Sequence, residues 1–431
     1  MTTATLAAAA LPALSPAQAA SSLSGQSGPR QVATRVAEAG DRMIAYRQWT
    51  TDRQLDRGQL AGVKQVAGSL RIAKPVSTRR YVDPHGKPTK RYDVGHWTSP
   101  WAAPGFGLNE LIASWDATTP RDTWIEVQVR GRSEDGRRSS WDTLGRWAQG
   151  DARFFRTSVP RQGDDIATVA TDTWRTQYSL EMVSYQLRVK LMRRTGTRAT
   201  PVVDTIGAMV SNLPSYTDVR TSRTGMRSRT VLDVPRYSQM IHRGDYPQYG
   251  NGGEAWCSPT STSMVLGYYK RLPAPEQYAW VKHSHPNRFV DHAARMVFDH
   301  EYDGAGNWPF NTAYAANHAD SGFVTRLRSL REAERFIRAG IPVVASISFG
   351  PGELTGAPIR STAGHLLVIV GFEANGDVIV NDPAAARNKG VRRTYDRGQF
   401  EDAWLPKSGG LSYVIRTANR PLPPRNGVQN W

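Results

Sequence analysis

The sequence predicts two differently built parts, an all-β first part resembling an antiparallel sandwich and a second part of α+β class. Three observations support this. Period-two alternation of apolar and polar residues dominates the first part, helix signals and continuous apolar runs dominate the second, and a polar stretch separates them. The length of 431 residues suits two or three domains. The predicted segments are a secretory signal remnant (1–20), a flexible linker (21–37), the β part (38–219), a second linker (220–229), the α+β part (230–416) and a C-terminal tail (417–431).

Two segments of the β part carry the clearest strand pattern. Apolar residues at 125, 127 and 129 alternate with polar ones, and residues 185–191 repeat the pattern. Residues 111–115 and 202–210 are weaker strand candidates, and turn sequences such as Asp135-Gly136 recur between the segments. Short strands separated by turns favour an antiparallel sandwich.

Tryptophan is concentrated in the β part, which holds eight of the 13 in the chain. We expect these indoles to fill the core of the sandwich, because Trp carries a large apolar surface. The alternative is that some are exposed, where a flat indole face can stack on a sugar ring. The β part contains no recognisable catalytic constellation.

The charge balance is strongly basic, with 55 Lys and Arg against 38 Asp and Glu, a formal net charge of +17. This allows an anionic partner, such as an acidic cell-wall polymer or a glycan at the β part, although a solvated basic surface explains it equally simply. No folded nucleic-acid-recognition motif is found, so specific nucleic-acid binding is not expected. No apolar run approaches the roughly 18 residues of a spanning helix, so we expect no membrane span.

The first 20 residues resemble the end of a secretory signal. A short apolar run precedes a small-x-small site at Ala17-Gln18-Ala19, but no basic residue precedes Arg30. The signal is either degenerate or begins upstream, and a low-complexity tail is the alternative. We therefore expect an extracellular protein, with cell-wall association as an option.

Cys257 is the only cysteine of the chain, so an intramolecular disulfide and a cysteine-rich zinc site are both excluded. It follows a glycine-rich loop, and the next residues are Ser258, a plausible N-cap, and Pro259, which suits the first helical position. Cys257 would then lie at the start of a helix, where free N–H groups favour a thiolate. The alternative is a small buried hydrophobic residue.

A second piece of chemistry lies in a predicted hairpin. His365 precedes the apolar run 366–372, Asn375-Gly376 marks a turn, and the run 378–382 ends at Asp382. Pairing the two runs returns Asp382 to the end of the sheet where His365 lies. A carboxylate beside an imidazole fixes its tautomer and stabilises the imidazolium. Taken alone, His365 fits a core histidine and Asp382 a turn residue, but with Cys257 they form the set that a cysteine peptidase needs.

Three sequence blocks, VPRYSQ (234–239), WCSPTSTSMVL (256–266) and GHLLVIVGFEANGDVIVNDP (364–383), resemble those of the C39-like cysteine peptidases, a branch of the papain-like fold. The resemblance covers residues 230–416. It implies a helix carrying the nucleophile Cys257, packed against an antiparallel sheet. His365 would then be the general base, Asp382 the residue that orients it and Gln239 the oxyanion-hole donor. The β part resembles the domain that accompanies this peptidase in some secreted proteins of high-GC Gram-positive bacteria.

Two departures from the family pattern bear on the oxyanion donor. The usual Cys-Gly-Pro is Cys-Ser-Pro here, and Gln239 lies 18 residues before Cys257 instead of about six. Asn251 occupies the position six before and carries an amide that can donate. An insertion over 240–251 would reconcile the spacing, so Gln239 and Asn251 both remain candidates.

The residues between the Cys and His blocks predict one helix and one strand. A capping box at Ser329 and Glu332 begins the helix, Gly340 ends it, and the strand follows at 341–348. No metal or other cofactor is expected, because the histidines of this stretch match no trusted zinc spacing and are expected at the surface: His283, His285, His292, His300 and His318.

The sequence therefore predicts a secreted cysteine peptidase that hydrolyses amide bonds of a peptide or protein substrate through an acyl-enzyme. One alternative is a cell-wall peptide amidase or endopeptidase directed by the β part. The other, from a different class, is a catalytically inactive surface-binding protein in which Cys257 is inert.

Overall fold

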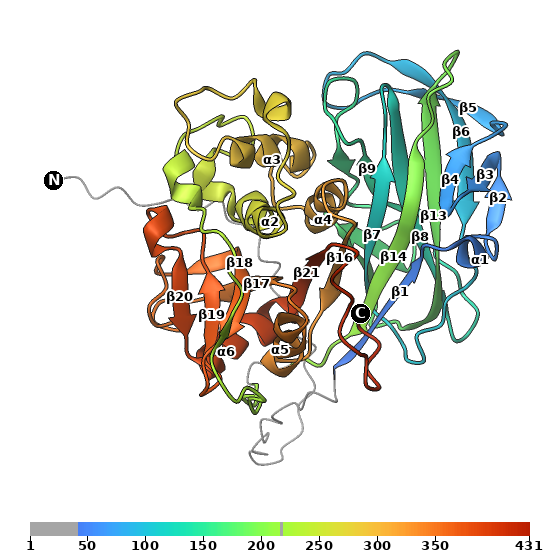
Figure 1. Cartoon of the computed structure of the whole chain (residues 1–431). Coiled ribbons are helices and arrows are strands. Elements are labelled where there is room, and N and C mark those ends of the chain that lie inside the picture. The colour runs from blue at the N-terminus through green and yellow to red at the C-terminus, as the bar shows by residue number, and fades with distance from the viewer. Residues whose placement is uncertain (1–41, 216–218) are drawn as a thin grey trace, which may run out of the picture.

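The computed structural model describes residues 42–215 and 219–431, so the predicted signal (1–20) and first linker (21–37) lie outside the described residues. The described part is mostly β, with three antiparallel seven-stranded sheets and few helices. Two sheets are built from strands within 43–212 and the third from strands within 230–416. Figure 1 shows the first two sheets together on one side of the molecule and the third sheet on the other. None of the helices in the described part is long and apolar enough to cross a membrane.

The first sheet contains both weaker strand candidates, which pair with each other along most of their length. Its strands in spatial order are β11 (Ala167–Ala170), β12 (Thr173–Thr176), β7 (Glu110–Thr118), β14 (Val202–Asn212), β4 (Ser69–Ile72) and β3 (Val63–Val66), with β1 (Met43–Trp49) paired to β14. These strand predictions are confirmed, because residues 111–115 lie in β7 and 202–210 lie in β14.

The second sheet is centred on the two clearest predicted strands. It runs β10 (Thr157–Ser158), β9 (Asp142–Trp147), β8 (Thr123–Ser133), β13 (Met182–Arg194), β6 (Lys90–Thr98) and β2 (Gln59–Ala61), with β5 (Ser77–Tyr81) paired to β6. Val129 pairs with Leu187, and both side chains are fully buried. The polar face is also partly covered, because Glu126 is buried beneath ion pairs with Arg79, Arg146 and Lys190.

Tryptophans join the first two sheets, as the core expectation requires. Trp49 of β1 packs edge-on against Trp97 of β6, with ring centroids 5.7 Å apart, and Trp115 of β7 contacts Trp147 of β9. Six of the eight indoles in this half are buried: Trp49, Trp97, Trp115, Trp124, Trp147 and Trp174. The other two, Trp101 and Trp141, are partly exposed, so the core assignment is wrong for them.

The third sheet holds the predicted hairpin. Its order is β16 (Ser321–Arg326), β21 (Leu411–Arg416), β17 (Val343–Phe349), β18 (Thr362–Phe372), β19 (Val378–Asn381) and β20 (Arg392–Tyr395), with β15 (Thr230–Val231) paired to β18. Gly376 turns the hairpin with a φ of 98°, a backbone conformation that glycine adopts without strain. The hairpin prediction is therefore confirmed.

Helices and short 3-10 turns surround the third sheet, except α1, which lies beside β3 of the first sheet. The α-helices are α1 (Asp52–Leu55), α2 (Cys257–Tyr268), α3 (Phe289–Val297), α4 (Trp308–Ala316), α5 (Leu330–Arg338) and α6 (Arg397–Ser408), and the 3-10 turns are η2 (Gln239–His242), η3 (Gly253–Ala255), η4 (Pro275–Tyr278) and η5 (Asn388–Gly390). Helix α2 lies against β18, α3 and α4. The prediction of one helix and one strand between the Cys and His blocks was incomplete, because α3, α4 and β16 also lie there.

The predicted cap of α2 is wrong, and the predicted cap of α5 is confirmed as the N-cap position but without its side-chain bond. The N-cap of α2 is Trp256, one residue before Cys257, and the Ser258 hydroxyl instead bonds the Tyr413 hydroxyl at 2.9 Å. Ser329 is the N-cap of α5, but its side chain makes no capping bond, and the Leu330 N–H donates to the Glu401 carboxylate at 2.7 Å. At α2 a tertiary contact replaces the local capping bond of Ser258.

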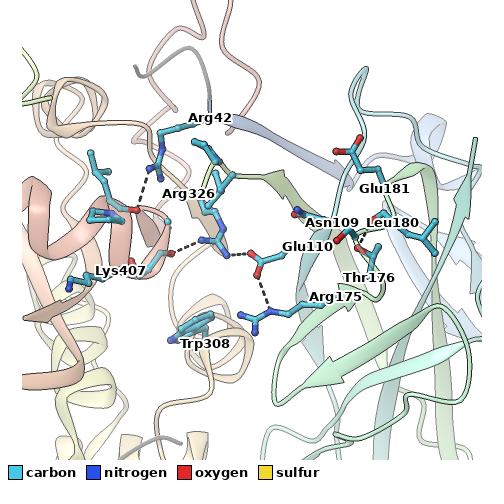
Figure 2. A pocket seen from close by; sticks show the side chains of 17 residues that line it. Arg42, Asn109, Glu110, Arg175, Thr176, Leu180, Glu181, Trp308, Arg326 and Lys407 are labelled. Atoms are coloured by element: carbon cyan, nitrogen blue, oxygen red, sulfur yellow. Dashed lines mark hydrogen bonds and ion pairs between the residues drawn. The ribbon is translucent and has the colours of Figure 1, made fainter. Parts of the chain in front are cut away.

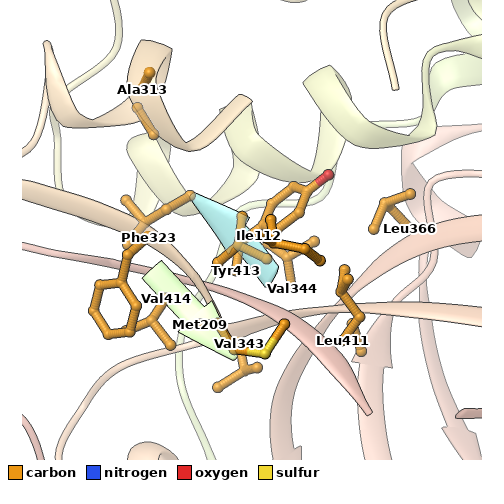
Figure 3. Packing of buried hydrophobic residues seen from close by; sticks show 14 of the residues in the cluster. Ile112, Met209, Ala313, Phe323, Val343, Val344, Leu366, Leu411, Tyr413 and Val414 are labelled. Atoms are coloured by element: carbon orange, nitrogen blue, oxygen red, sulfur yellow. The ribbon is translucent and has the colours of Figure 1, made fainter. Parts of the chain in front are cut away.

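The first sheet and the third sheet share one continuous apolar core. Figure 3 shows Ile112 and Met209, from β7 and β14, beside Phe323 and Val414 of the third sheet. Backbone contact accompanies the apolar packing, because the Val324 N–H donates to the Ser114 hydroxyl at 2.9 Å. The two halves are therefore packed as one body.

A polar pocket of about 570 Å³ lies at the edge of this junction (Figure 2). Glu110 lies within it, between Arg326 at 2.6 Å and Arg175 at 2.9 Å. Arg42, Trp308 and Lys407 also line it. Its walls include none of the predicted catalytic residues.

Candidate active site

Cys257 is the first residue of α2, and its side chain is partly exposed while the next nine residues are buried. Two hydrogen bonds hold the start of the helix in place, one just before it and one in its second turn. The Trp256 indole is buried and donates to the Tyr249 carbonyl, and the Ser261 hydroxyl donates to the Leu366 carbonyl at 3.0 Å. The second bond joins the thiol-bearing helix to the strand position next to His365.

His365 and Asp382 lie together at the open end of the β18–β19 hairpin. The His365 Nε2 is 2.7 Å from Asp382 Oδ1, and their side chains are 4 % and 0 % exposed. Asp382 also accepts from the Tyr395 hydroxyl at 2.7 Å and from the Ala384 N–H at 3.0 Å. Three donors therefore hold this carboxylate in one orientation.

The electrostatics favour a thiolate beside an imidazolium. Burial acts to raise the pKa of Cys257, but the hydrogen bond and charge of His365, with the N–H groups of Leu366 and Ser258, bring it below its usual range. Burial acts to lower the pKa of His365, but Asp382 and Cys257 raise it well above normal. The same pairing overcomes burial at Asp382 and lowers the pKa of its carboxyl. The thiol of Cys257 is therefore electrostatically coupled to the hydrogen-bonded His365–Asp382 pair.

Gln239 and Asn251 occupy very different surroundings. Gln239 is 3 % exposed, and its Nε2 donates at 2.7 Å to the Glu254 carbonyl, in the turn that leads to Cys257. That bond uses one amide hydrogen and leaves the second for another acceptor. Asn251 is exposed in a tight turn, with a φ of 69°. Residues 240–251 thus form a loop that returns Gln239 to the start of α2.

Sequence reasoning missed two contributors to this arrangement. Tyr395 lies 13 residues beyond Asp382 on β20, and no local motif marks its hydroxyl as a partner.

A cluster of possible metal ligands, His242, Asp245 and Asp291, was also missed, and His285 adjoins it. His292 is buried, which contradicts the expectation of a surface histidine.

Two family models match the chain. The Peptidase C39 N-terminal domain matches residues 45–211, and the Peptidase_C39 like family matches residues 231–411. The second half of the chain therefore matches the C39-like peptidase family, and the first half matches the N-terminal domain described for the C39 peptidases. No curated protein matches the chain.

Two solved structures show weak similarity. A Bacillus anthracis protein assigned as a C39-like peptidase is 17 % identical, with coverage of 44 % of this chain and 98 % of that one and a TM-score of 0.29. The laminarinase from Rhodothermus marinus is 12 % identical, with coverage of 39 % and 91 % and a TM-score of 0.16. The family assignment therefore rests on the two sequence matches.

Proposed function

We propose that the protein is a secreted cysteine peptidase in which Cys257, His365 and Asp382 form the catalytic triad. The single observation that carries the proposal is the buried, hydrogen-bonded His365–Asp382 pair in contact with the one thiol of the chain. A thiol-bearing helix packed against an antiparallel sheet with His and Asp also supports a papain-like α+β organisation for the second half.

The geometry suggests a two-step hydrolysis. The Cys257 thiolate attacks the substrate carbonyl carbon, and the imidazolium of His365 gives its proton to the leaving amine as the C–N bond breaks. A thioester remains on Sγ. His365, now neutral, removes a proton from water, whose oxygen attacks the thioester and releases the carboxylic acid product and the thiol. Because Asp382 holds Nε2, Nδ1 is the ring nitrogen left to exchange the proton in both steps.

Gln239 is the better candidate for the oxyanion donor. Its free amide hydrogen and the backbone N–H of Cys257 would stabilise the negative oxygen of the tetrahedral intermediate. We expect Gln239→Ala to lower kcat by about 10²–10³-fold, the usual effect of removing one such donor. Asn251→Ala, which removes the exposed amide, is the matched control and should leave kcat unchanged. The reverse ranking in initial-rate assays would transfer the role to Asn251.

The rate of Cys257 alkylation against pH, read by mass spectrometry on the full chain, tests the proposed triad. The thiolate reacts, so the native protein should show a midpoint below the roughly 8.5 of free cysteine. The midpoint should rise in His365→Ala, because the imidazolium that stabilises the thiolate is lost. Slow alkylation with an ordinary midpoint, unchanged by this substitution, would instead support the inactive surface-binding protein.

A second candidate role, targeting to an acidic wall polymer, is supported by a row of stacked side chains on the second sheet. Arg130 stacks on both Trp101 and Trp141, at 5.2 and 4.5 Å, and Arg188 lies 4.0 Å over Trp141. Arg132 adds a further cation over Trp101. Among the described residues, none of these guanidinium groups forms an ion pair with a carboxylate.

Retention on an anionic polysaccharide tests this second role. We expect the full chain to bind in low salt and to elute as the ionic strength rises, because the contacts are largely electrostatic. Arg130→Ala combined with Arg188→Ala should elute earlier than Arg137→Ala, a control in which the lost Arg is already paired with Asp135. Equal elution of the two variants would exclude this face.

A further inference from the structure

A compact cluster of histidine and aspartate side chains lies beside the start of α2. It joins three separate segments, since His242 ends η2, Asp245 follows in the next turn, and Asp291 belongs to the first turn of α3. These three residues offer ligand atoms that all lie within 4.8 Å of one another. His285 lies at the rim, with its Nδ1 3.1 Å from Asp245 Oδ2 and 3.3 Å from Asp291 Oδ1.

The polar atoms at the centre of the cluster lack the partners that burial demands. The side chains of His242 and Asp291 are both 0 % exposed. Neither ring nitrogen of His242, nor Oδ2 of Asp291, has a hydrogen-bond partner among the described residues, although His242 Nδ1 and Asp291 Oδ2 are 3.1 Å apart. Buried polar groups in native proteins are normally satisfied, and two carboxylates that converge on one point favour a cation between them.

The spacing of the ligand atoms suits a small divalent metal. Zinc binds imidazole nitrogen and carboxylate oxygen at about 2.0–2.2 Å, which places neighbouring ligands of a tetrahedral site about 3.3 Å apart. His242 Nδ1 lies 3.1 Å from the Asp291 oxygen and 3.6 Å from the Asp245 oxygen. The imidazole nitrogens favour zinc over calcium or magnesium, which take oxygen ligands.

We propose that His242, Asp245 and Asp291 bind a structural zinc ion, with His285 contacting the two carboxylates at the rim of the site. His242 and Asp291 are fully buried and His285 covers the rim, so the surroundings fit a structural zinc better than a catalytic one that is open to substrate. The ion would tie the loop at 240–251 to α3. No zinc spacing is visible in the sequence, because the two histidines are separated by the whole of α2 and the segments around it.

The position of the site connects it with the proposed active site. A Cβ on Gly253 would lie 2.3 Å from the Gln239 carbonyl oxygen and 2.5 Å from the carbonyl carbon of His242, so η2 packs directly on η3. The His242 ring also faces Trp256, with centroids 6.1 Å apart. Zinc would therefore hold both Gln239 and the first turn of α2 in place. This role, unlike the site itself, rests on the proposed function.

Zinc binding by the full-length chain, after removal of metal with a chelator, tests the site. We expect one equivalent of Zn²⁺ to bind in competition with a chromogenic chelator, in the native chain and in Cys257→Ala, which excludes the thiol as a ligand. His242→Gln and Asp291→Asn should each weaken binding by at least the roughly 10–100-fold that loss of an outer-shell partner costs. His283→Gln, a neighbouring exposed histidine, is the matched control and should bind as the native chain does.

Two further measurements keep the proposal falsifiable if a buried variant fails to fold. His285→Gln changes only the rim and should still reduce the affinity, and added Zn²⁺ should raise the Tm of the native chain but not of this variant. Absence of stoichiometric Zn²⁺ binding by the native chain, or equal affinity in His242→Gln, Asp291→Asn and His285→Gln, would overturn the site. Stoichiometric binding without any effect of zinc removal on hydrolysis would overturn only its link to Gln239.

Discussion

Cys257→Ala is expected to lower kcat for peptide hydrolysis by at least about 10⁴-fold, because it removes the atom that forms the acyl-enzyme. The loss should appear in kcat and not in KM, because the substrate-binding surface and the His365–Asp382 hydrogen bond do not involve Sγ. Initial rates on a fluorogenic peptide that the native enzyme cleaves would measure it.

Ser263→Ala is a suitable control for this substitution. Ser263 belongs to the same helix, but its hydroxyl donates to the Pro259 carbonyl at 2.8 Å and does not contact the thiol. This variant should retain nearly native kcat. Substantial hydrolysis by Cys257→Ala would rule out the proposed nucleophile, and an equal loss in the control would point to damage to the helix.

Asp382→Asn is expected to reduce kcat by about 10⁴-fold, the effect of the equivalent change in a serine-protease triad. The carboxylate raises the pKa of His365, and an amide cannot do so. The imidazolium should therefore be lost at lower pH. The alkaline limb of the kcat/KM profile should move to lower pH, and the Cys257 alkylation midpoint should rise.

Tyr395→Phe is a milder substitution with which the effect of Asp382→Asn can be compared. It removes one of the three donors to the carboxylate and leaves the charge and the His365 contact in place. A single hydrogen bond to a charged group corresponds to roughly a 10–150-fold change at most, well below the loss expected for Asp382→Asn. If Asp382→Asn cost no more than Tyr395→Phe, or left the pH profile unchanged, Asp382 would not be the residue that supports His365.

The parts of the site that local sequence determines were predictable. Asn375-Gly376 between two β-branched runs specifies a hairpin, and this hairpin alone returns Asp382 to His365. The placement of Cys257 at the start of α2 was correct, although the predicted cap, Ser258, lies inside the helix. The strands β8 and β13 followed from strict alternation, but their pairing did not, nor did the burial of Glu126, because its three cationic partners come from separate strands.

Contacts between distant segments could not be predicted. The Tyr395 bond to Asp382 depends on β20 pairing with β19, and Ser258 gives up capping for a bond to Tyr413 on β21. The cluster around His242 depends on the loop at 240–251 folding onto α3. Each of these requires the tertiary fold, so residue type and spacing alone contain no signal for it.

The apolar junction between the first and third sheets limits how proteins of this build can diversify. Ile112 and Met209 are fully buried only because Phe323 and its neighbours cover them, so separating the halves would leave apolar surface on both. Exchange of the first half for an unrelated module would require compensating substitutions on β16 and β21. The two halves are therefore expected to be inherited together, with variation concentrated on outward-facing positions away from this junction.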